Sequence, residues 1–149
     1  MSSPDGTTVR FRRTPPDFRR RGVERFALRL QKEVAKGQPF DCLITGDADL
    51  RRLNREFRGL DYPTDVLSFP AAAPAVHLGD LAISLGRARA QARQFGHPIE
   101  QEVEILMLHG VLHLLGFDHE TDRGQMARAE KRWRTRLGLT TGLIERVRP

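Results

Sequence analysis

The sequence has a single cysteine, one tryptophan and one tyrosine among its 149 residues. An intrachain disulfide needs two cysteines, so Cys42 cannot belong to a disulfide framework, which is typical of a reducing compartment. No segment approaches the about 20 consecutive apolar residues of a membrane-spanning helix, and residues 1–17 lack the apolar core of a secretory signal. The length fits one ordinary domain. We therefore expect a cytoplasmic protein folded as a single domain over residues 1–149.

Positive charge is concentrated near the N-terminus. The whole chain has a formal charge of +6, whereas residues 10–36 contain ten Lys or Arg and three acidic residues. This basic segment alone has a charge of +7, and the rest of the chain has a charge of −1. A surface that binds a polyanion needs such a local excess, because neutralised phosphates release counterions. A solvated arginine-rich helix face has the same composition, so charge alone leaves both interpretations open.

Glycine and proline divide the chain into short alternating apolar segments and longer segments with helical spacing. The alternating segments predict strands at residues 7–12, 40–45, 65–70 and 78–86. Helical spacing predicts helices at residues 17–36, 48–57, 86–95, 98–115 and 121–137. Asp47 is the expected N-cap of the second helix, and Pro98 is the expected first residue of the fourth.

The order of these elements predicts an α+β fold, with one mixed sheet of about four strands and helices packed against it. The first connections resemble strand–helix–strand units, which pair their strands in parallel. The last two strands are joined without a helix, so we expect them to be antiparallel. The helix at residues 98–115 is almost entirely apolar after Glu104, and we expect it to be central and buried.

Three of the five histidines lie in HGVLHLLGFDH, residues 109–119. His109 and His113 are four residues apart and share one helix face. Gly116 can reverse the chain and bring His119 to the same point. Three imidazoles suit zinc and leave a fourth position for water, as in catalytic zinc sites. Burial of unpartnered imidazoles would cost about 1–3 kcal/mol each, so a metal site explains the pattern better than core histidines do.

The residue after the first histidine separates this motif from the metallopeptidases. The spacing equals that of the HExxHxxGxxH peptidases, but Gly110 stands where their Glu acts as the base. Asp118 or Glu120 could serve instead, although contact with a metal-bound imidazole, or simple solvation, suits them better. His77 and His97 lack comparable neighbours, and we expect His97 at a helix cap or on the surface.

The segment LNREFRGLDYPTDVLSFP, residues 53–70, has an arginine at the predicted end of a helix. From there, the planar guanidinium of Arg58 could bind a phosphate through two hydrogen bonds and stabilise charge in a transition state. The position also suits a cation that interacts with the helix dipole, and spacing alone favours this second interpretation. We expect Thr64, Asp65 and Ser68 to hold the loop, without a chemical role.

Three segments together, LNREFRGLDYPTDVLSFP, LGDLAIS and HGVLHLLGFDH, resemble the YbeY family of bacterial metal-dependent endoribonucleases over residues 40–137. The resemblance implies a single α+β domain and a functional Arg58. It also implies a zinc ion held by His109, His113 and His119. The implied activity is single-strand-specific cleavage in maturation of the 3′ end of 16S rRNA, with a part in ribosome quality control and contacts with small-subunit ribosomal proteins.

The implied chemistry is phosphodiester cleavage in which zinc activates water near neutral pH or polarises a phosphoryl oxygen. Arg58 would orient the phosphate, and residues 10–36 would hold the RNA backbone. Phe117 departs from the family pattern, which usually has Tyr there, and so removes a hydroxyl. The native ion could be another divalent transition metal, and either water or the adjacent 2′-hydroxyl could attack.

Two alternatives remain at this stage. The first is a ribosome-assembly factor that binds RNA without cleaving it and whose metal is structural, because no obvious base replaces the Glu missing at position 110. The second is a degenerate metallopeptidase.

Overall fold

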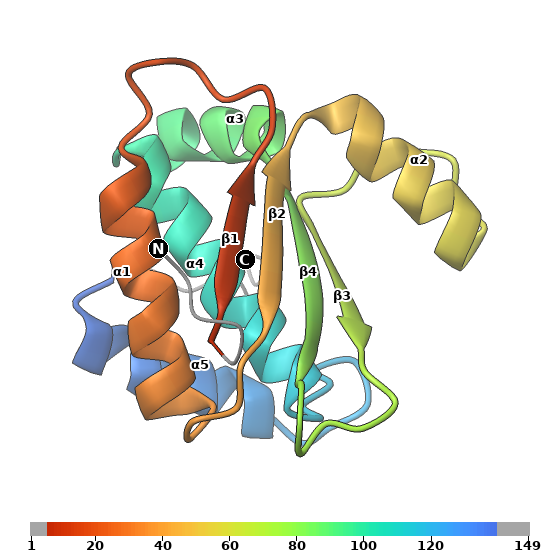
Figure 1. Ribbon diagram of the computed structural model, residues 1–149, viewed down its shortest axis with the longest axis vertical. Coiled ribbons are helices and arrows are strands. Elements are labelled where there is room, and N and C mark those ends of the chain that lie inside the picture. The colour runs from red at the N-terminus through yellow and green to blue at the C-terminus, as the bar shows by residue number, and fades with distance from the viewer. Residues whose placement is uncertain (1–5, 140–149) are drawn as a thin grey trace.

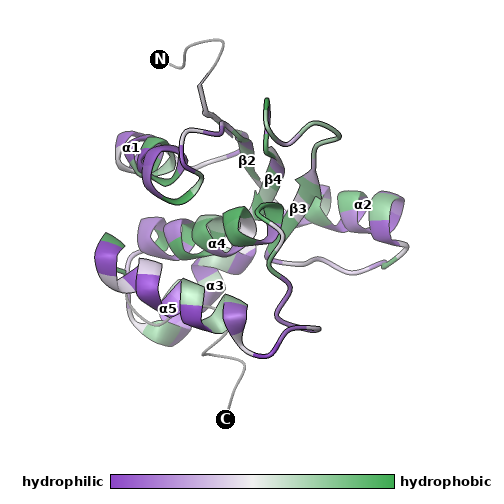
Figure 2. Cartoon of the chain, turned by 90° about the horizontal axis from the view of Figure 1, so that it is seen from below, coloured by the Kyte–Doolittle hydropathy of each residue, from purple (hydrophilic) through white to green (hydrophobic). Residues whose placement is uncertain are grey.

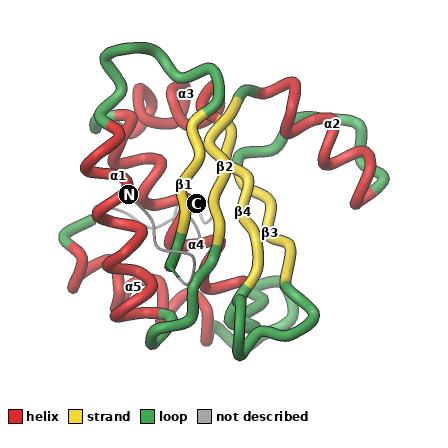
Figure 3. The backbone as a smooth tube through the Cα atoms, in the orientation of Figure 1, coloured by secondary structure: helices red, strands yellow, loops and turns green. Residues whose placement is uncertain are grey.

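The computed structural model describes residues 6–139 and contains one four-stranded mixed sheet (Figures 1 and 3). Its strands are β1 (Thr8–Phe11), β2 (Asp41–Thr45), β3 (Val66–Pro70) and β4 (Gly79–Ser84). The order across the sheet is β1-β2-β4-β3. β2 pairs in parallel with β1 and with β4, whereas β3 is antiparallel to β4. The predicted α+β class is confirmed.

The helices are α1 (Arg20–Arg29), α2 (Asp47–Arg58), α3 (Leu85–Phe95), α4 (Ile99–Leu114) and α5 (Gln125–Leu137). The helix expected at residues 17–36 starts later, and its final part, Leu30–Val34, is a wider π-helical turn. α5 begins at Gln125 rather than at 121, because the Asp122 carboxylate accepts the backbone N–H groups of Gly124 and Met126 and forms a turn.

Two expected helix starts are wrong by one residue. Gly46, in an extended conformation, is the N-cap of α2, and Asp47 is the first helical residue. The Asp47 carboxylate instead accepts a hydrogen bond from Ser84 Oγ. Pro98 is the N-cap residue of α4 rather than its first residue, since its ψ of 150° is still extended. Both differences leave the elements themselves as predicted.

Strand β3 does not pair with β2, its predecessor in the chain. β4 lies between them, and β3 becomes an antiparallel edge strand. Five of the six β4 residues are buried, which suits a strand covered on both faces. β3 includes Ser68 and ends at Pro70, which an edge position tolerates because proline cannot donate to a ladder.

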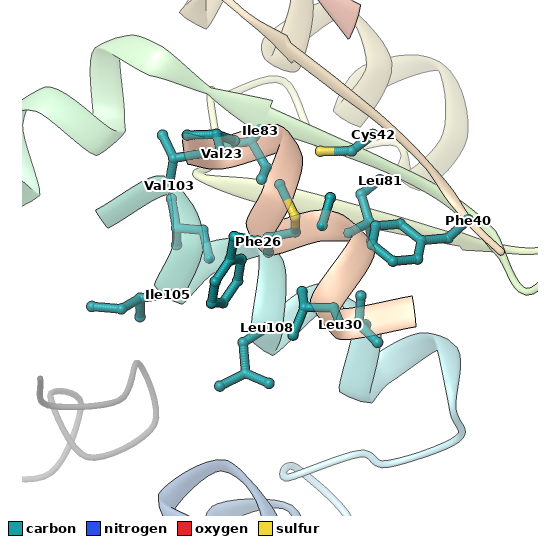
Figure 4. Packing of buried hydrophobic residues seen from close by; sticks show 14 of the residues in the cluster. Val23, Phe26, Leu30, Phe40, Cys42, Leu81, Ile83, Val103, Ile105 and Leu108 are labelled. Carbon is teal, nitrogen blue, oxygen red and sulfur yellow. The ribbon is translucent and has the colours of Figure 1, made fainter. Parts of the chain in front are cut away.

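Helix α4 is the central helix of the fold, as predicted. It contacts β3 and β4 as well as α1, α3 and α5, and Figure 2 shows its apolar residues between the sheet and the more polar outer helices. Figure 4 shows Val103 and Leu108 of α4 packed near Phe26 of α1 and Ile83 of β4. In the last turn of α4, Val111, Leu112 and Leu114 are buried in the same core, which holds that turn in place. Within residues 6–139, no helix has the length and apolarity that crossing a bilayer requires.

On the other face of the sheet, α2 packs through Leu50 on Leu67 of β3 and Ala82 of β4. Its far end extends away from the sheet beside the β3 edge (Figure 1). The carboxyl end of α2 therefore lies beside the β3 edge, between the sheet face covered by α4 and the face covered by α2.

Candidate metal centre

The last turns of α4 and the loop after it bring three histidine side chains together. Gly116 has a φ of 99°, a left-handed conformation that suits glycine, and there the chain turns back. The His109 ring centroid lies 4.8 Å from that of His113 and 5.5 Å from that of His119, and the other two centroids are 5.6 Å apart. One nitrogen from each ring lies within 4.8 Å of the others. The predicted convergence is present.

The chemistry of this group fits a divalent metal ion. Nδ1 of His119 is buried and has no hydrogen-bond partner. Burial lowers the pKa of His113, and the charges of His109 and His119 lower it further. A lowered pKa favours the neutral imidazole, the form that binds metals. Imidazole ligands suit zinc, copper, iron and nickel alike, so the residues are compatible with a metal ion without identifying which.

Glu130 of α5 holds the His109 ring. Its Oε2 lies 2.8 Å from Nδ1 of His109, and both residues are buried. A carboxylate in this place makes Nδ1 the donor and leaves Nε2 for an ion. Sequence reasoning missed Glu130, which is 21 residues from His109 on another helix. A signal was available, since Glu130 lies four residues after Met126 and seven before Leu137, on the apolar stripe of an otherwise basic helix.

Asp118 and Glu120, the two acidic residues that flank His119 in the sequence, both line the cleft. Oδ1 of Asp118 accepts the N–H of Glu120 at 3.1 Å, and the Asp118 carbonyl accepts the N–H groups of Thr121 and Asp122. Asp118 therefore shapes the turn that carries His119. Glu120 is exposed and lines the cleft.

Gly110 occupies its position for a packing reason. A Cβ there would lie 2.7 Å from Cδ2 of Leu81 and 3.3 Å from Cγ2 of Val66. The carbonyl of Gly110 also accepts a hydrogen bond from Ser68 Oγ at 3.2 Å. At position 110, α4 approaches β3 and β4 so closely that a side chain has no room. The Glu of the peptidases therefore cannot be accommodated there.

Arg58 and the three histidines line one cleft of about 510 Å³. Arg58 is the last residue of α2, which ends at Gly59 with a φ of 69°. Its side chain is exposed, and β3 residues Val66–Ser68 line the same cleft. Asp65 holds the loop before β3 as expected, since its Oδ2 accepts from Gln91 at 3.2 Å. Phe117 also lines the cleft.

The other two histidines lie elsewhere. Of the two positions expected for His97, a helix cap or the surface, the structure has the first, since His97 directly precedes the N-cap of α4. Its side chain is 6% exposed, and its Nε2 lies 2.5 Å from Oε1 of the buried Glu102. His77 lies 3.4 Å from Asp80 and 3.7 Å from Asp41, where Asp41 also accepts a hydrogen bond from Thr8 Oγ1.

Together these features define an α+β domain with a three-histidine group in a cleft at the end of a buried helix. Comparison with known proteins matches residues 18–138 to the family described as Endoribonuclease YbeY. The chain belongs to this family, which confirms the resemblance of its motifs.

Individual relatives agree with the family match. A Solibacter usitatus protein named Endoribonuclease YbeY is 74% identical over 147 residues, which cover 99% of each chain. Its counterpart from Koribacter versatilis is 46% identical over 122 residues, or 82% of this chain and 80% of the relative. The solution structure of TM1509 from Thermotoga maritima has a TM-score of 0.58 and 27% identity. The match covers 86% of this chain and 93% of that chain.

Proposed function

We propose that this chain is a zinc-dependent endoribonuclease that cleaves single-stranded RNA. Its substrate would be the 3′ region of 16S rRNA, in maturation and quality control of the small ribosomal subunit. The observation that carries the proposal is one cleft that contains His109, His113 and His119 together with Arg58. Support comes from relatives that are named endoribonucleases. An rRNA substrate places the activity in the cytoplasm, with small-subunit ribosomal proteins as partners.

In this proposal the three neutral imidazoles hold the ion, and Glu130 fixes the orientation of His109. When bound, zinc supplies a Lewis acid for a phosphoryl oxygen and lowers the pKa of a water molecule to about 7. The close-packed core around α4 keeps the ligands in place, because a rigid helix holds a site more precisely than a loop does.

Arg58 binds the phosphate and neutralises the charge that develops on its oxygens. Arg58 is the last residue of α2, and the loop that follows is tied to this helix because Asn54 Nδ2 donates to the Tyr62 carbonyl at 2.9 Å.

Three carboxylates line the cleft. That of Asp65 accepts hydrogen bonds from the Val66 N–H and from Gln91, which leaves two for proton transfer. Asp118 is engaged in its turn, and Glu120 is exposed. The product ends identify the attacking group, because a 2′,3′-cyclic phosphate requires attack by the 2′-hydroxyl.

The test is cleavage of an unstructured RNA by purified wild type, Arg58→Ala and His113→Ala. Arg55→Ala is the matched control, since it removes the same charge from the same exposed face one turn earlier in α2. We expect wild type and the control to cleave, and the other two variants to lose about 10²–10³-fold in rate. Metal content is measured on each preparation.

Three outcomes would overturn the proposal. Equal cleavage by all four proteins would identify a contaminating nuclease. RNA binding without cleavage, by a protein that unfolds when its metal is removed, would instead indicate an assembly factor with a structural metal. Turnover of a peptide with no cleavage of RNA would indicate a metallopeptidase.

A further inference from the structure

The carboxyl end of α2 presents an aromatic side chain to solvent. Phe57 is 65% exposed, whereas Phe18, Phe26 and Phe40 are at most 7% exposed. Tyr62, in the loop that follows α2, is 53% exposed. Single exposed apolar residues are common, but here two exposed aromatic residues lie close in the sequence to Arg58, the arginine that lines the metal cleft.

The Phe57 ring and the backbone of the loop that contains Tyr62 both have contacts that hold them in place. The Phe57 ring contacts Phe69 of β3, with centroids 5.3 Å apart and planes at 66°. The loop with Tyr62 is tied to α2, since the fully buried Asn54 donates to the Tyr62 carbonyl, and Arg51 Nε lies 2.9 Å from Asp61 Oδ1. An ordered ring loses little entropy when a ligand stacks on it.

Phe57 contacts Phe69, which lines a second hollow. This hollow of about 400 Å³ lies on the sheet face near α2 and is lined by Phe69 and Leu53, with Arg10 and Arg12 among its other residues. The metal cleft is lined by β3 residues 66–68. Edge strand β3 thus contributes to both hollows, and α2 lies beside it at the border of the sheet (Figure 2).

We propose that Phe57 forms a base-stacking subsite. A single RNA strand crosses the edge of β3, with its reacting phosphate at Arg58 and the base of an adjoining nucleotide stacked on Phe57. The strand continues into the second hollow, where Arg10 is available to the next phosphate. This inference rests on the proposed RNA substrate. It gives single-strand specificity a physical origin, because a base in a duplex is already stacked and cannot lie on a protein ring.

The arginines near Phe57 suit the phosphates of RNA better than an apolar peptide. Both hollows contain charges of both signs: Arg58 lines the metal cleft with three acidic residues, and Arg10 and Arg12 line the second hollow with two. The arginines supply the contacts for phosphates. A polyanion with flat apolar groups matches cationic and aromatic side chains in alternation. Base stacking on an aromatic ring tolerates every base, so the subsite would contribute affinity without sequence preference.

The experiment measures binding of a ten-nucleotide 2′-O-methyl oligouridylate to the full chain by fluorescence anisotropy, with the oligomer verified intact afterwards. An abasic oligomer of equal length and charge is the second ligand. The proteins are wild type, Phe57→Ala, Phe57→Trp and Leu28→Ala. Leu28→Ala is the control, because it removes a 51% exposed apolar side chain from α1. Thermal melts verify that each variant is folded.

We expect Phe57→Ala to bind oligouridylate about tenfold more weakly than wild type, and Phe57→Trp and Leu28→Ala to bind as wild type does. With the abasic oligomer, wild type and Phe57→Ala should bind equally, since no base remains to stack. An equal effect of Phe57→Ala on both oligomers, or no effect on either, would overturn the subsite and leave a protein-docking role for the ring.

This assay separates the subsite from the proposed function. One possible result is that the wild type binds RNA but never cleaves it, while Phe57→Ala loses the base-dependent part of the binding. This result would support the subsite and contradict the proposed nuclease activity. Cleavage that depends on Arg58 but not on Phe57 would support the nuclease and remove the subsite.

Discussion

The carboxylate of Glu130 lies 2.8 Å from Nδ1 of His109, and both side chains are buried where α5 meets α4. This contact connects the last described helix to the candidate metal centre. A carboxylate behind a metal-binding imidazole fixes the ring and raises its basicity. The proposed centre therefore depends on four residues rather than three.

Glu130→Gln should weaken zinc binding about 10–100-fold, because the amide keeps the size of the side chain but lacks its charge. The affinity is measured by competition with a chromophoric chelator. Glu120→Gln, at an exposed residue of the same cleft, is the control and should bind zinc as wild type does. Equal affinities for wild type and Glu130→Gln would show that the carboxylate has no role in metal binding.

Gly110→Ala should destabilise the fold by about 1–3 kcal/mol, because the new methyl group would lie 2.7 Å from Leu81 Cδ2 in a close-packed core. The free energy of unfolding in urea measures this. Gly22→Ala is the matched control within α1, where the nearest atom is 4.0 Å away, at the end of the Arg25 side chain. There the same change should stabilise the helix by up to about 1 kcal/mol. If Gly110→Ala were as stable as wild type, the packing argument would be contradicted.

Local parts of the site could be predicted from the sequence, and long-range parts could not. His109, His113 and His119 follow from helix spacing and a glycine turn, which depend on eleven neighbouring residues. Glu130 depends on how α5 docks against α4, which no periodicity specifies. Spacing alone favoured a helix-dipole role for Arg58, and only the packing of α2 beside β3 shows that this arginine shares the cleft with the histidines.

The sheet shows the same limit. Alternation found each strand, but strand order depends on which strand best tolerates burial on both faces. β4 lies next to β2 in the interior of the sheet, and β3 lies at the edge. The chain order alone would have placed β3 next to β2, because β3 directly follows α2.

Glu104 should make stability depend on pH. Burial raises its pKa from 4.5 to about 7, and the charge of Glu100 adds to this effect. Because the folded state keeps its proton to higher pH than the unfolded state, stability should fall as pH rises from 4.5 to about 7 and then level off. Glu104→Gln removes this loss. Its free energy of unfolding at pH 8 should exceed that of wild type by about 1 kcal/mol, after allowance for solvent screening of a partly exposed group.

This gain is measured by urea unfolding at pH 4 and pH 8. The gain should vanish at pH 4, where Glu104 is protonated in both states. Glu56→Gln, at an exposed residue of α2, should show no such pH-dependent gain. A gain of the same size at both pH values would show that the effect is not a titration.

Arg19, Arg20 and Arg21 should contribute to the binding of long RNA only. They lie at the start of α1, on the β1 side, whereas the metal cleft opens at β3 on the opposite edge of the sheet (Figure 1). Their replacement by Gln should reduce the slope of log K against log salt by about 2, since each single-strand phosphate contact contributes about 0.7. The slope for an oligomer that fills only the cleft should not change. An unchanged slope with long RNA would show that these arginines do not contact it.

The contact between Glu130 and His109 also bears on the order of events during synthesis. His109, His113 and His119 leave the ribosome before Glu130 does, and α5 can dock only after its own residues have emerged. An incomplete polypeptide therefore has no finished metal centre. For an enzyme whose proposed target is ribosomal RNA, the centre therefore reaches its full proposed affinity for metal only after α5 has emerged from the ribosome.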